Sequence, residues 1–409
     1  MKYRPAIVAI AYDRPEALAR LLGSIENAVY PEGTSPTLVI SIDKSGSTDV
    51  SDVARQFKYS HGDKVLIERP ERMGLRDHVI ACGDLTSQYG SIIVLEDDLY
   101  VAPNFYNYAC AALEYTGDDD RIGGVSLYCH LFNVHVREPF EPVEDGYDNW
   151  YLQIASSWGQ AYTKEQWNTF KKWYEDNRDR DLAGPNVPAN VSGWSDRSWL
   201  KYYIAYLIET GRYFIYPRIS MTTNFGDIGS HADKTETDLQ VPIQCSRRIT
   251  GYVFSSLDKS RSVYDAFFEP AGALVDGKVC TGGLPDTYDG EEKRGLIVDL
   301  YGSKPLDEMI SYIKNDAADK EAVNYILTSK CLPYREVKSF GRQMRPVDAN
   351  IIYKVKGNDF HLYDIRKNAR PPKQGQAARK FLYDYRGISV TKMIQMVKYR
   401  VRERFGRDR

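Results

Sequence analysis

The sequence of 409 residues lacks any apolar run near the roughly 20 residues needed to cross a bilayer. The N-terminus leads into an apolar stretch at residues 6–11, which is too short for the core of a signal peptide. The six cysteines form no Cys-x-x-Cys pair, which indicates reduced thiols rather than a disulfide framework or a zinc site. We therefore expect a soluble cytoplasmic protein without a transmembrane helix or signal peptide.

Several motifs of nucleotide and hydrolase chemistry are also absent. There is no G-x-x-x-x-G-K-[ST] phosphate loop, and no G-x-G-x-x-G follows the first predicted strand. The nucleophile elbow G-x-S-x-G is missing, which argues against a serine hydrolase. No basic RNA-binding motif accompanies the 31 tyrosines, so we expect no nucleic-acid partner.

The chain has the composition of a folded protein, with 43% hydrophobic and 27% charged residues. Its pattern divides it into residues 1–130, 131–240, 241–365 and 366–409. The first hundred residues alternate β-branched runs with helical patterns, which is typical of βαβ units and a parallel sheet. The sequence predicts strands at residues 6–11, 37–42, 64–67 and 91–95, and helices at residues 15–27, 49–57, 75–88, 196–210 and 306–314. Ligands of such α/β sheets bind at the carboxyl ends of the strands.

Three consecutive acids follow the fourth predicted strand, at Glu96, Asp97 and Asp98. Adjacent like charges repel unless a cation neutralises them, and oxygen ligands without a nearby His or Cys pair favour Mg²⁺ or Mn²⁺ over zinc. Such a metal would stabilise a departing nucleoside diphosphate. The alternative is a solvated acidic loop or the first turn of a helix.

Residues 94–105 (VLEDDLYVAPNF) closely resemble the metal-binding segment of inverting GT-A glycosyltransferases. The N-acetylglucosaminyltransferase I type and bacterial family 2 sugar transferases of surface-polysaccharide pathways are the most similar, and the resemblance covers residues 5–235. It implies a GT-A fold, which is a Rossmann-like α/β fold with a mostly parallel central sheet flanked by helices. It also implies Asp98 as the metal ligand, with Glu96 and Asp97 contacting the ribose and donor sugar.

Three further segments match in the same order, namely residues 10–15 (IAYDRP), 40–43 (ISID) and 72–76 (RMGLR). The resemblance implies that Arg14 contacts the diphosphate or nucleoside, that Asp43 faces uracil, and that Arg76 approaches the donor. Asp13 and Asp43 could instead form helix caps or turns, and Arg76 could be a surface residue.

Residues 192–199 (SGWSDRSW) supply the candidate acceptor side. An inverting transferase needs a carboxylate there to take the acceptor proton. The resemblance implies Asp196 as this base and Trp194 as a flat surface for an acceptor sugar. Ser195 separates the two residues, which departs from the family pattern, and Ser195 or Asp196 could instead cap the following helix.

Two more residues are assigned by resemblance. His231 lies in residues 222–231 (TTNFGDIGSH), which resemble a glycine-containing loop that orders over bound donor. His231 is therefore a donor-binding candidate, as a lid or structural residue, and a contact to phosphate or the metal is the alternative. Trp158, in residues 156–159 (SSWG), would line the donor-sugar pocket, and a buried structural Trp is the alternative.

The C-terminal part has a different character. Residues 241–365 predict an α+β extension, whereas residues 366–409 hold 14 Lys and Arg against three acids, a net charge of +11. Apolar residues recur at spacings of three and four within residues 390–405, so we predict a basic amphipathic helix that binds an anionic membrane surface. Packing on the domain or on a partner is the alternative.

Together these features predict a metal-dependent inverting glycosyltransferase, with residues 1–130 as the nucleotide-sugar-binding half and residues 131–240 as the acceptor-binding half of a GT-A domain. The donor is a nucleotide sugar, UDP being favoured by resemblance, and the acceptor is a glycan or lipid-linked glycan of bacterial surface-polysaccharide assembly. The protein would lie in the cytoplasm, peripheral to the inner face of the membrane. The competing hypotheses are a sugar-nucleotide nucleotidyltransferase and an inactive carbohydrate-binding or scaffold protein. The sequence predicts no oligomeric state.

Overall fold

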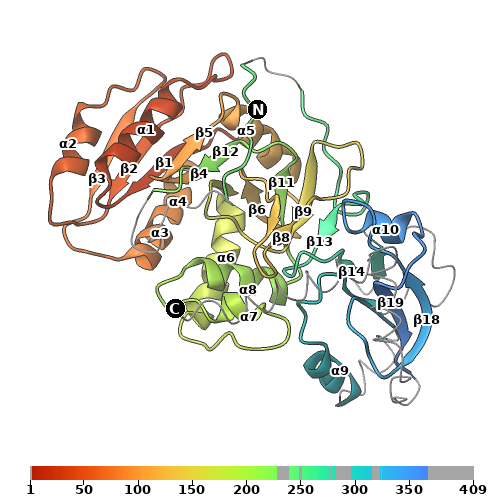
Figure 1. Cartoon of the computed structure of the whole chain (residues 1–409). Coiled ribbons are helices and arrows are strands. Elements are labelled where there is room, and N and C mark those ends of the chain that lie inside the picture. Colours follow the sequence, from red (N-terminus) through yellow and green to blue (C-terminus); the bar gives the residue numbers. More distant parts are fainter. Residues whose placement is uncertain are drawn as a thin grey trace, which may run out of the picture.

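The computed structural model describes residues 2–227, 239–247, 251–275, 278–281, 296–315, 323 and 325–366. Figure 1 shows a large sheet with helices packed around it and a smaller C-terminal sheet beside it. The predicted tail helix lies outside the described residues. Every helix among the described residues is too short or too polar to cross a membrane.

Nine strands form the central sheet. They are β1 (Ala6–Ala11), β2 (Leu38–Ile42), β3 (Lys64–Glu68), β4 (Ser91–Glu96), β6 (Ile122–Ser126), β9 (Asn149–Leu152), β10 (Gln160–Thr163), β11 (Tyr213–Pro217) and β13 (Val263–Tyr264). Their order is β13-β9-β11-β6-β10-β4-β1-β2-β3. β10 is antiparallel to β4 and β6, and β11 to β9, whereas the other five pairs are parallel. The predicted mostly parallel α/β fold is confirmed.

Helices cover both faces of this sheet. They are α1 (Pro15–Glu26), α2 (Asp49–Gln56), α3 (Leu75–Gly83), α4 (Thr86–Tyr89), α5 (Phe105–Thr116), α6 (Lys164–Asn177), α7 (Ala189–Ser192) and α8 (Leu200–Glu209). Ile7 and Ala9 of β1 share a core with α1, α2 and α5. Val8 and Ile10 share a second core with α3, α6 and α8, because successive strand residues point to opposite faces. Burial on both faces explains why β1 is a continuous apolar run.

Two predicted helices differ from the structure. The helix predicted at residues 75–88 is divided into α3 and α4. The helix predicted at residues 196–210 begins at Leu200, with Trp199 at the N-cap position, so neither Ser195 nor Asp196 caps it. Instead, Oγ of Ser195 accepts a hydrogen bond from the backbone N–H of Arg197 at 3.1 Å. This local turn competes with the helix and delays its start.

The C-terminal α+β extension has a separate sheet of order β16-β17-β19-β18. Its elements are β16 (Leu296–Asp299), α9 (Leu306–Asn315), β17 (Tyr325–Thr328), β18 (Arg335–Phe340), α10 (Ala349–Ile352) and β19 (Phe360–Asp364). Glu269, which follows β13 and is fully buried, accepts hydrogen bonds from the N–H groups of Leu300 and Tyr301 at 2.8 and 2.7 Å. This carboxylate therefore connects the extension to the edge of the large sheet.

Three two-stranded sheets complete the described structure. They are β5 (Leu99–Val101) with β12 (Thr222–Asn224), β7 (Phe132–Asn133) with β8 (Glu138–Pro139), and β14 (Gly272–Val275) with β15 (Lys278–Thr281). The first of these brings residues 222–224 beside the segment that follows the acidic triplet.

Candidate functional site

A cavity of about 560 Å³, which we call the strand-end cavity, opens at the carboxyl ends of β1, β2 and β4. These strands are adjacent and parallel, so the residues that follow them meet at one edge of the sheet. Five predicted site residues line this cavity, namely Arg14, Asp43, Glu96, Asp97 and Asp98. The structure thus brings together the predicted residues of three separate segments.

The acidic triplet is only partly neutralised by protein groups. Arg14, at the N-cap of α1, donates a hydrogen bond to Oδ1 of Asp97 and lies 3.4 Å from Oδ2 of Asp98. Burial raises the pKa of Asp97 to about 6, although Arg14 opposes the rise. Burial, followed by the charges of Asp98 and Asp97, also raises the pKa of Glu96. One guanidinium against three carboxylates leaves this corner with an excess of negative charge.

Asp98 has an oxygen that fits a metal ion. Its Oδ1 atom is buried and has no hydrogen-bond partner in the described part of the chain. A buried carboxylate oxygen without a partner is costly unless a cation neutralises it. Nowhere among the described residues do three or more His, Cys, Asp or Glu side chains gather as a ligand set. A Mg²⁺ or Mn²⁺ ion at Asp98 would take few protein carboxylates, with water or phosphate oxygens as its other ligands.

A distant segment borders the triplet. The backbone N–H of Phe225 donates to the carbonyl oxygen of Asp98 at 2.9 Å. Arg20 of α1 lies 3.9 Å above the Phe225 ring and forms an ion pair with Asp227, which lines the strand-end cavity. His231, which was predicted in the continuation of this segment, lies outside the described residues.

Asp43 organises the turn before α3. It is 4% exposed, and its carboxylate accepts hydrogen bonds from the N–H groups of Lys44, Met73 and Gly74 at 2.9, 2.8 and 2.9 Å. Gly74 has φ of 80°, a conformation that glycine adopts at little cost. Asp43 is thus a turn-forming residue as well as a lining residue. Asp13 caps no helix, because Arg14 occupies the N-cap of α1.

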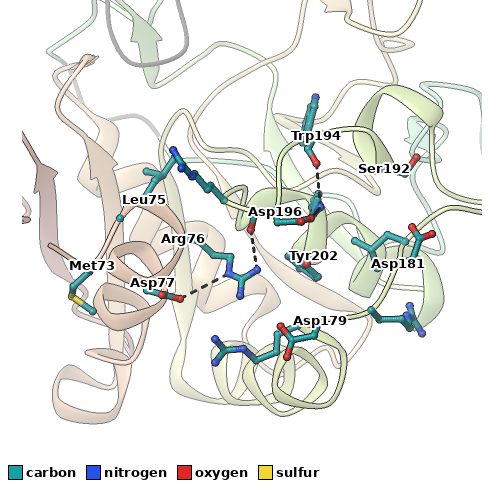
Figure 2. Close-up of a pocket in the computed structure, with 16 residues that line it drawn as sticks. Met73, Leu75, Arg76, Asp77, Asp179, Asp181, Ser192, Trp194, Asp196 and Tyr202 are labelled. Carbon is teal, nitrogen blue, oxygen red and sulfur yellow. Dashed lines mark hydrogen bonds and ion pairs between the residues drawn. The ribbon is translucent and has the colours of Figure 1, made fainter.

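A second cavity of about 780 Å³, which we call the helix-end cavity, adjoins the first. Figure 2 shows Trp194, Asp196 and Tyr202 around it. The two cavities share four lining residues, namely Met73, Gly74, Leu75 and Arg197. The candidate base Asp196 and the candidate platform Trp194 therefore line a cavity that borders the cavity of the acidic triplet, with the shared residues between the two.

Asp196 is held at both its backbone and its carboxylate. Nη1 of Arg76 donates to its carbonyl oxygen at 2.9 Å, and Nζ of Lys201 donates to its Oδ1 at 2.7 Å (Figure 2). The hydrogen bond from Lys201, followed by its charge, lowers the pKa of Asp196. An aspartate carboxylate is ionised at neutral pH, as a general base must be, and Lys201 extends this ionised range to lower pH.

Two predicted donor residues lie elsewhere. Arg76 lines the helix-end cavity and not the strand-end cavity. The Trp158 ring packs 4.7 Å from that of Tyr128 and 5.8 Å from that of His130, and it lines neither cavity. In this structure Arg76 thus contacts the loop that carries Asp196, and Trp158 is part of an aromatic cluster.

The sequence assigned no role to four residues that line at least one of the cavities, namely Arg72, His78, Arg197 and Lys201. His78 of α3 lies 2.8 Å from Oγ of Ser41 through Nε2, and burial lowers its pKa to about 4. Arg197 directly follows the candidate base Asp196, and this position in the sequence could have marked it as a site residue. Lys201 is the buried basic residue of an otherwise apolar helical turn, a pattern that indicates a paired charge.

No protein-family model matches the chain. The chain is 26% identical over 254 residues to an α-1,3-mannosyl-glycoprotein 2-β-N-acetylglucosaminyltransferase of Arabidopsis thaliana, a match that covers 58% of this chain. The chain spans 51% of the length of that curated relative. This similarity confirms the resemblance to N-acetylglucosaminyltransferase I-type enzymes that the motifs indicate.

Two solved structures are also similar. One is the mannosyltransferase PcManGT of Pyrobaculum calidifontis in complex with GDP-Man and Mn²⁺, with 17% identity, a TM-score of 0.34, and coverage of 53% of this chain and 55% of that one. The other is S. aureus TarS 1-349, with 12% identity, a TM-score of 0.34, and coverage of 53% and 59%.

Proposed function

We propose that the chain is an inverting, metal-dependent glycosyltransferase that moves a sugar from a nucleotide-sugar donor to a hydroxyl of a glycan. The observation that carries this proposal is the junction of two cavities, one with the acidic triplet and one with Asp196 and Trp194. A donor and an acceptor require two adjoining sites. The similarity to an N-acetylglucosaminyltransferase supports the same reaction class.

The strand-end cavity would hold the donor. Arg14 and Asp43 would border the nucleoside, and Glu96 and Asp97 the ribose and sugar. Oδ1 of Asp43 accepts from both Lys44 and Met73, whereas Oδ2 accepts only from Gly74, so Oδ2 retains a lone pair that can accept an N–H of a nucleobase. UDP is favoured because the motifs resemble the N-acetylglucosaminyltransferase I type.

The reaction would occur where the cavities meet. The oxygen of the acceptor hydroxyl forms a bond to the anomeric carbon, and the bond from that carbon to the diphosphate oxygen breaks. The electron pair of the broken bond leaves with the nucleoside diphosphate, and the hydroxyl proton goes to the carboxylate of Asp196. Attack opposite the leaving group inverts the anomeric configuration. A general base typically contributes about 10²–10⁴ in rate.

A divalent cation held by Asp98 would supply positive charge to the diphosphate oxygens of the donor. The protein's own groups have separate tasks. Arg14 fixes the orientation of Asp97 and Asp98, and Lys201 holds the carboxylate of Asp196 in place. Asp43 fixes the turn that separates the two cavities.

The test is a panel of UDP-, GDP- and dTDP-sugars incubated with Mn²⁺ and glycan acceptors, with release of the nucleoside diphosphate as the readout. We expect release with at least one donor, inversion at the anomeric carbon by NMR, and loss of both in Asp98→Asn. A nucleotidyltransferase would instead release pyrophosphate from a nucleoside triphosphate and a sugar phosphate. An inactive binding protein would release nothing from any donor and would bind glycans equally well after Asp98→Asn.

The proposal extends to the setting of the enzyme. We propose a glycan or lipid-linked acceptor of bacterial surface-polysaccharide assembly, reached at the inner membrane face through the basic tail of residues 366–409. Flotation with anionic liposomes tests the tail. The full chain should float and the chain without residues 377–409 should not, and equal flotation would contradict membrane docking.

A further inference from the structure

The strand-end cavity has an excess of carboxylates for a site that must accept a diphosphate. Its six acids are Asp13, Asp43, Glu96, Asp97, Asp98 and Asp227, and its three arginines are Arg14, Arg72 and Arg197. Arg14 is occupied by the acidic triplet. One divalent cation at Asp98 would offset only part of the remaining charge. The cationic side chain of the protein that binds the diphosphate must therefore be that of Arg72 or Arg197.

Arg72 is available for this task. It stands in the turn between β3 and α3, it is exposed, and it pairs with no acid among the described residues. Its guanidinium lies 4.8 Å above the ring of Tyr12, which lines the same cavity. Stacking on an aromatic ring limits the freedom of the planar group and leaves its edge N–H groups for a ligand.

Arg197 approaches from the other half of the fold. It is exposed, it lines both cavities, and within the described part of the chain it also pairs with no acid. The hydrogen bond from its backbone N–H to Oγ of Ser195 fixes the turn that carries it. Asp196, the residue before it, lines only the helix-end cavity. Arg197 therefore stands at the junction of the two cavities, next in sequence to the candidate base.

We propose that Arg72 and Arg197 form an anion site that binds the diphosphate of the donor, as a partner to the cation at Asp98. The proposal rests on the proposed function for the identity of the ligand. Guanidinium groups suit it because they bind two phosphate oxygens at once and remain charged at every physiological pH. Arg197 stabilises the leaving diphosphate next to the residue that accepts the proton.

The chemistry of the site predicts which part of a ligand the arginines recognise. Their contacts are to phosphate oxygens, so they bind pyrophosphate and nucleoside diphosphates and add nothing to the binding of a nucleoside. Charge-assisted hydrogen bonds to phosphate are strong enough that loss of either arginine should weaken diphosphate binding by at least about tenfold. Loss of both should weaken it further.

The experiment is calorimetric titration of the full chain with Mg²⁺ present, using pyrophosphate, UDP, GDP, dTDP and the three corresponding nucleosides. The variants are Arg72→Gln, Arg197→Gln and the double variant. Arg212→Gln is the matched control, because Arg212 lies 5.6 Å above the ring of Tyr206 and lines neither cavity. Thermal unfolding of each variant confirms that it is folded.

We expect the two single variants to lose at least about tenfold in affinity for pyrophosphate and for the bound nucleoside diphosphate, with nucleoside binding and Arg212→Gln unchanged. Unchanged diphosphate affinity in the double variant, or an equal loss for nucleosides, would overturn the anion site while leaving sugar transfer intact. If pyrophosphate binding depended on the arginines but no sugar were transferred from any donor, the anion site would stand and the proposed glycosyltransferase activity would be wrong. Absence of diphosphate and pyrophosphate binding in the unmodified chain would overturn both.

Discussion

Nζ of Lys201 lies 2.7 Å from Oδ1 of Asp196, and the same ammonium group donates to the carbonyl oxygen of Trp194 at 3.1 Å. The Lys201 side chain is 6% exposed and that of Asp196 is 91% exposed. A buried cation in the first turn of α8 therefore fixes an exposed carboxylate at the wall of the helix-end cavity. The carboxylate remains open to an acceptor, while Lys201 fixes its position and lowers its pKa.

Asp196→Asn should remove most of the sugar transfer and leave donor binding intact. The amide cannot accept the acceptor proton, so we expect kcat to fall by about 10²–10⁴. Initial rates of nucleoside diphosphate release and calorimetric titration with the donor measure the two effects. Asp176→Asn, an exposed position on α6, is the control. Turnover near that of the unmodified chain would assign the base to another residue.

Lys201→Gln should move the acidic limb of the pH–rate profile to higher pH. Lys201 lowers the pKa of Asp196, so its removal raises that pKa, and the base is then ionised only at higher pH. The rate should fall most at acidic pH and least at alkaline pH. Lys172→Gln, an exposed lysine of α6, is the control. If the acidic limb of the pH–rate profile were the same in Lys201→Gln and the unmodified chain, this limb would report the ionisation of a group other than Asp196.

Asp98→Asn should weaken Mn²⁺ binding by at least about tenfold, since even residues that only support metal ligands cost about 10–100-fold when changed. The unpartnered Oδ1 of Asp98 is the reason for choosing this residue. Electron paramagnetic resonance of free Mn²⁺ measures the affinity without any turnover. Asp13→Asn provides a control in the same cavity, because Asp13 is exposed and precedes α1. Equal Mn²⁺ affinity in Asp98→Asn and the unmodified chain would contradict the metal assignment.

Local patterns predicted much of the first half of the fold. The first predicted strand has the observed bounds of β1, Ala6–Ala11, because a strand buried on both faces leaves a continuous apolar run. The acidic triplet was found because it directly follows such a run in β4. Both signals lie within a few residues of one another, which is the range over which periodicity is informative.

Contacts between distant segments could not be predicted in this way. The carboxylate of Asp43 meets the N–H groups of Met73 and Gly74, about thirty residues away, and Arg76 meets a carbonyl oxygen 120 residues away. These pairings depend on how the strands and helices pack. The sequence therefore identified Arg76 as a candidate site residue and could not show that it lies on the side of Asp196.

Asp43→Asn should destabilise the fold even without any ligand. One oxygen that accepts a backbone N–H becomes an NH₂ group that cannot accept it, and an unsatisfied buried donor costs about 1–3 kcal/mol. Urea unfolding of the unliganded chain measures this loss. Asp63→Asn, at an exposed position before β3, should change stability little. If Asp43→Asn kept its stability but bound nucleotide more weakly, the role of Asp43 would be contact with the nucleobase and not support of the turn.

His130 is a buried imidazole in an aromatic cage. The surrounding rings belong to Tyr128, Trp158, Tyr216 and Phe268, with centroids 5.1, 5.8, 5.6 and 5.4 Å from that of His130. Its Nε2 atom has no hydrogen-bond partner within the described residues. Burial lowers the pKa of His130 to about 3. The folded state thus strongly favours the neutral ring, whereas the unfolded chain takes up a proton near pH 6.5.

This difference makes the free energy of unfolding depend on acid. Above about pH 6.5 the ring is neutral in both states and costs nothing; as the pH falls toward 3, only the unfolded state is protonated, and up to about 1.4 kcal/mol is lost per pH unit. His130→Gln has no proton to take up, so its stability should fall less between pH 7.5 and 5 than that of the unmodified chain, as measured by urea unfolding at both values. His61→Gln, at a half-exposed histidine, is the matched control. If His130→Gln lost as much stability as the unmodified chain over this interval, the acid sensitivity would have to come from other groups.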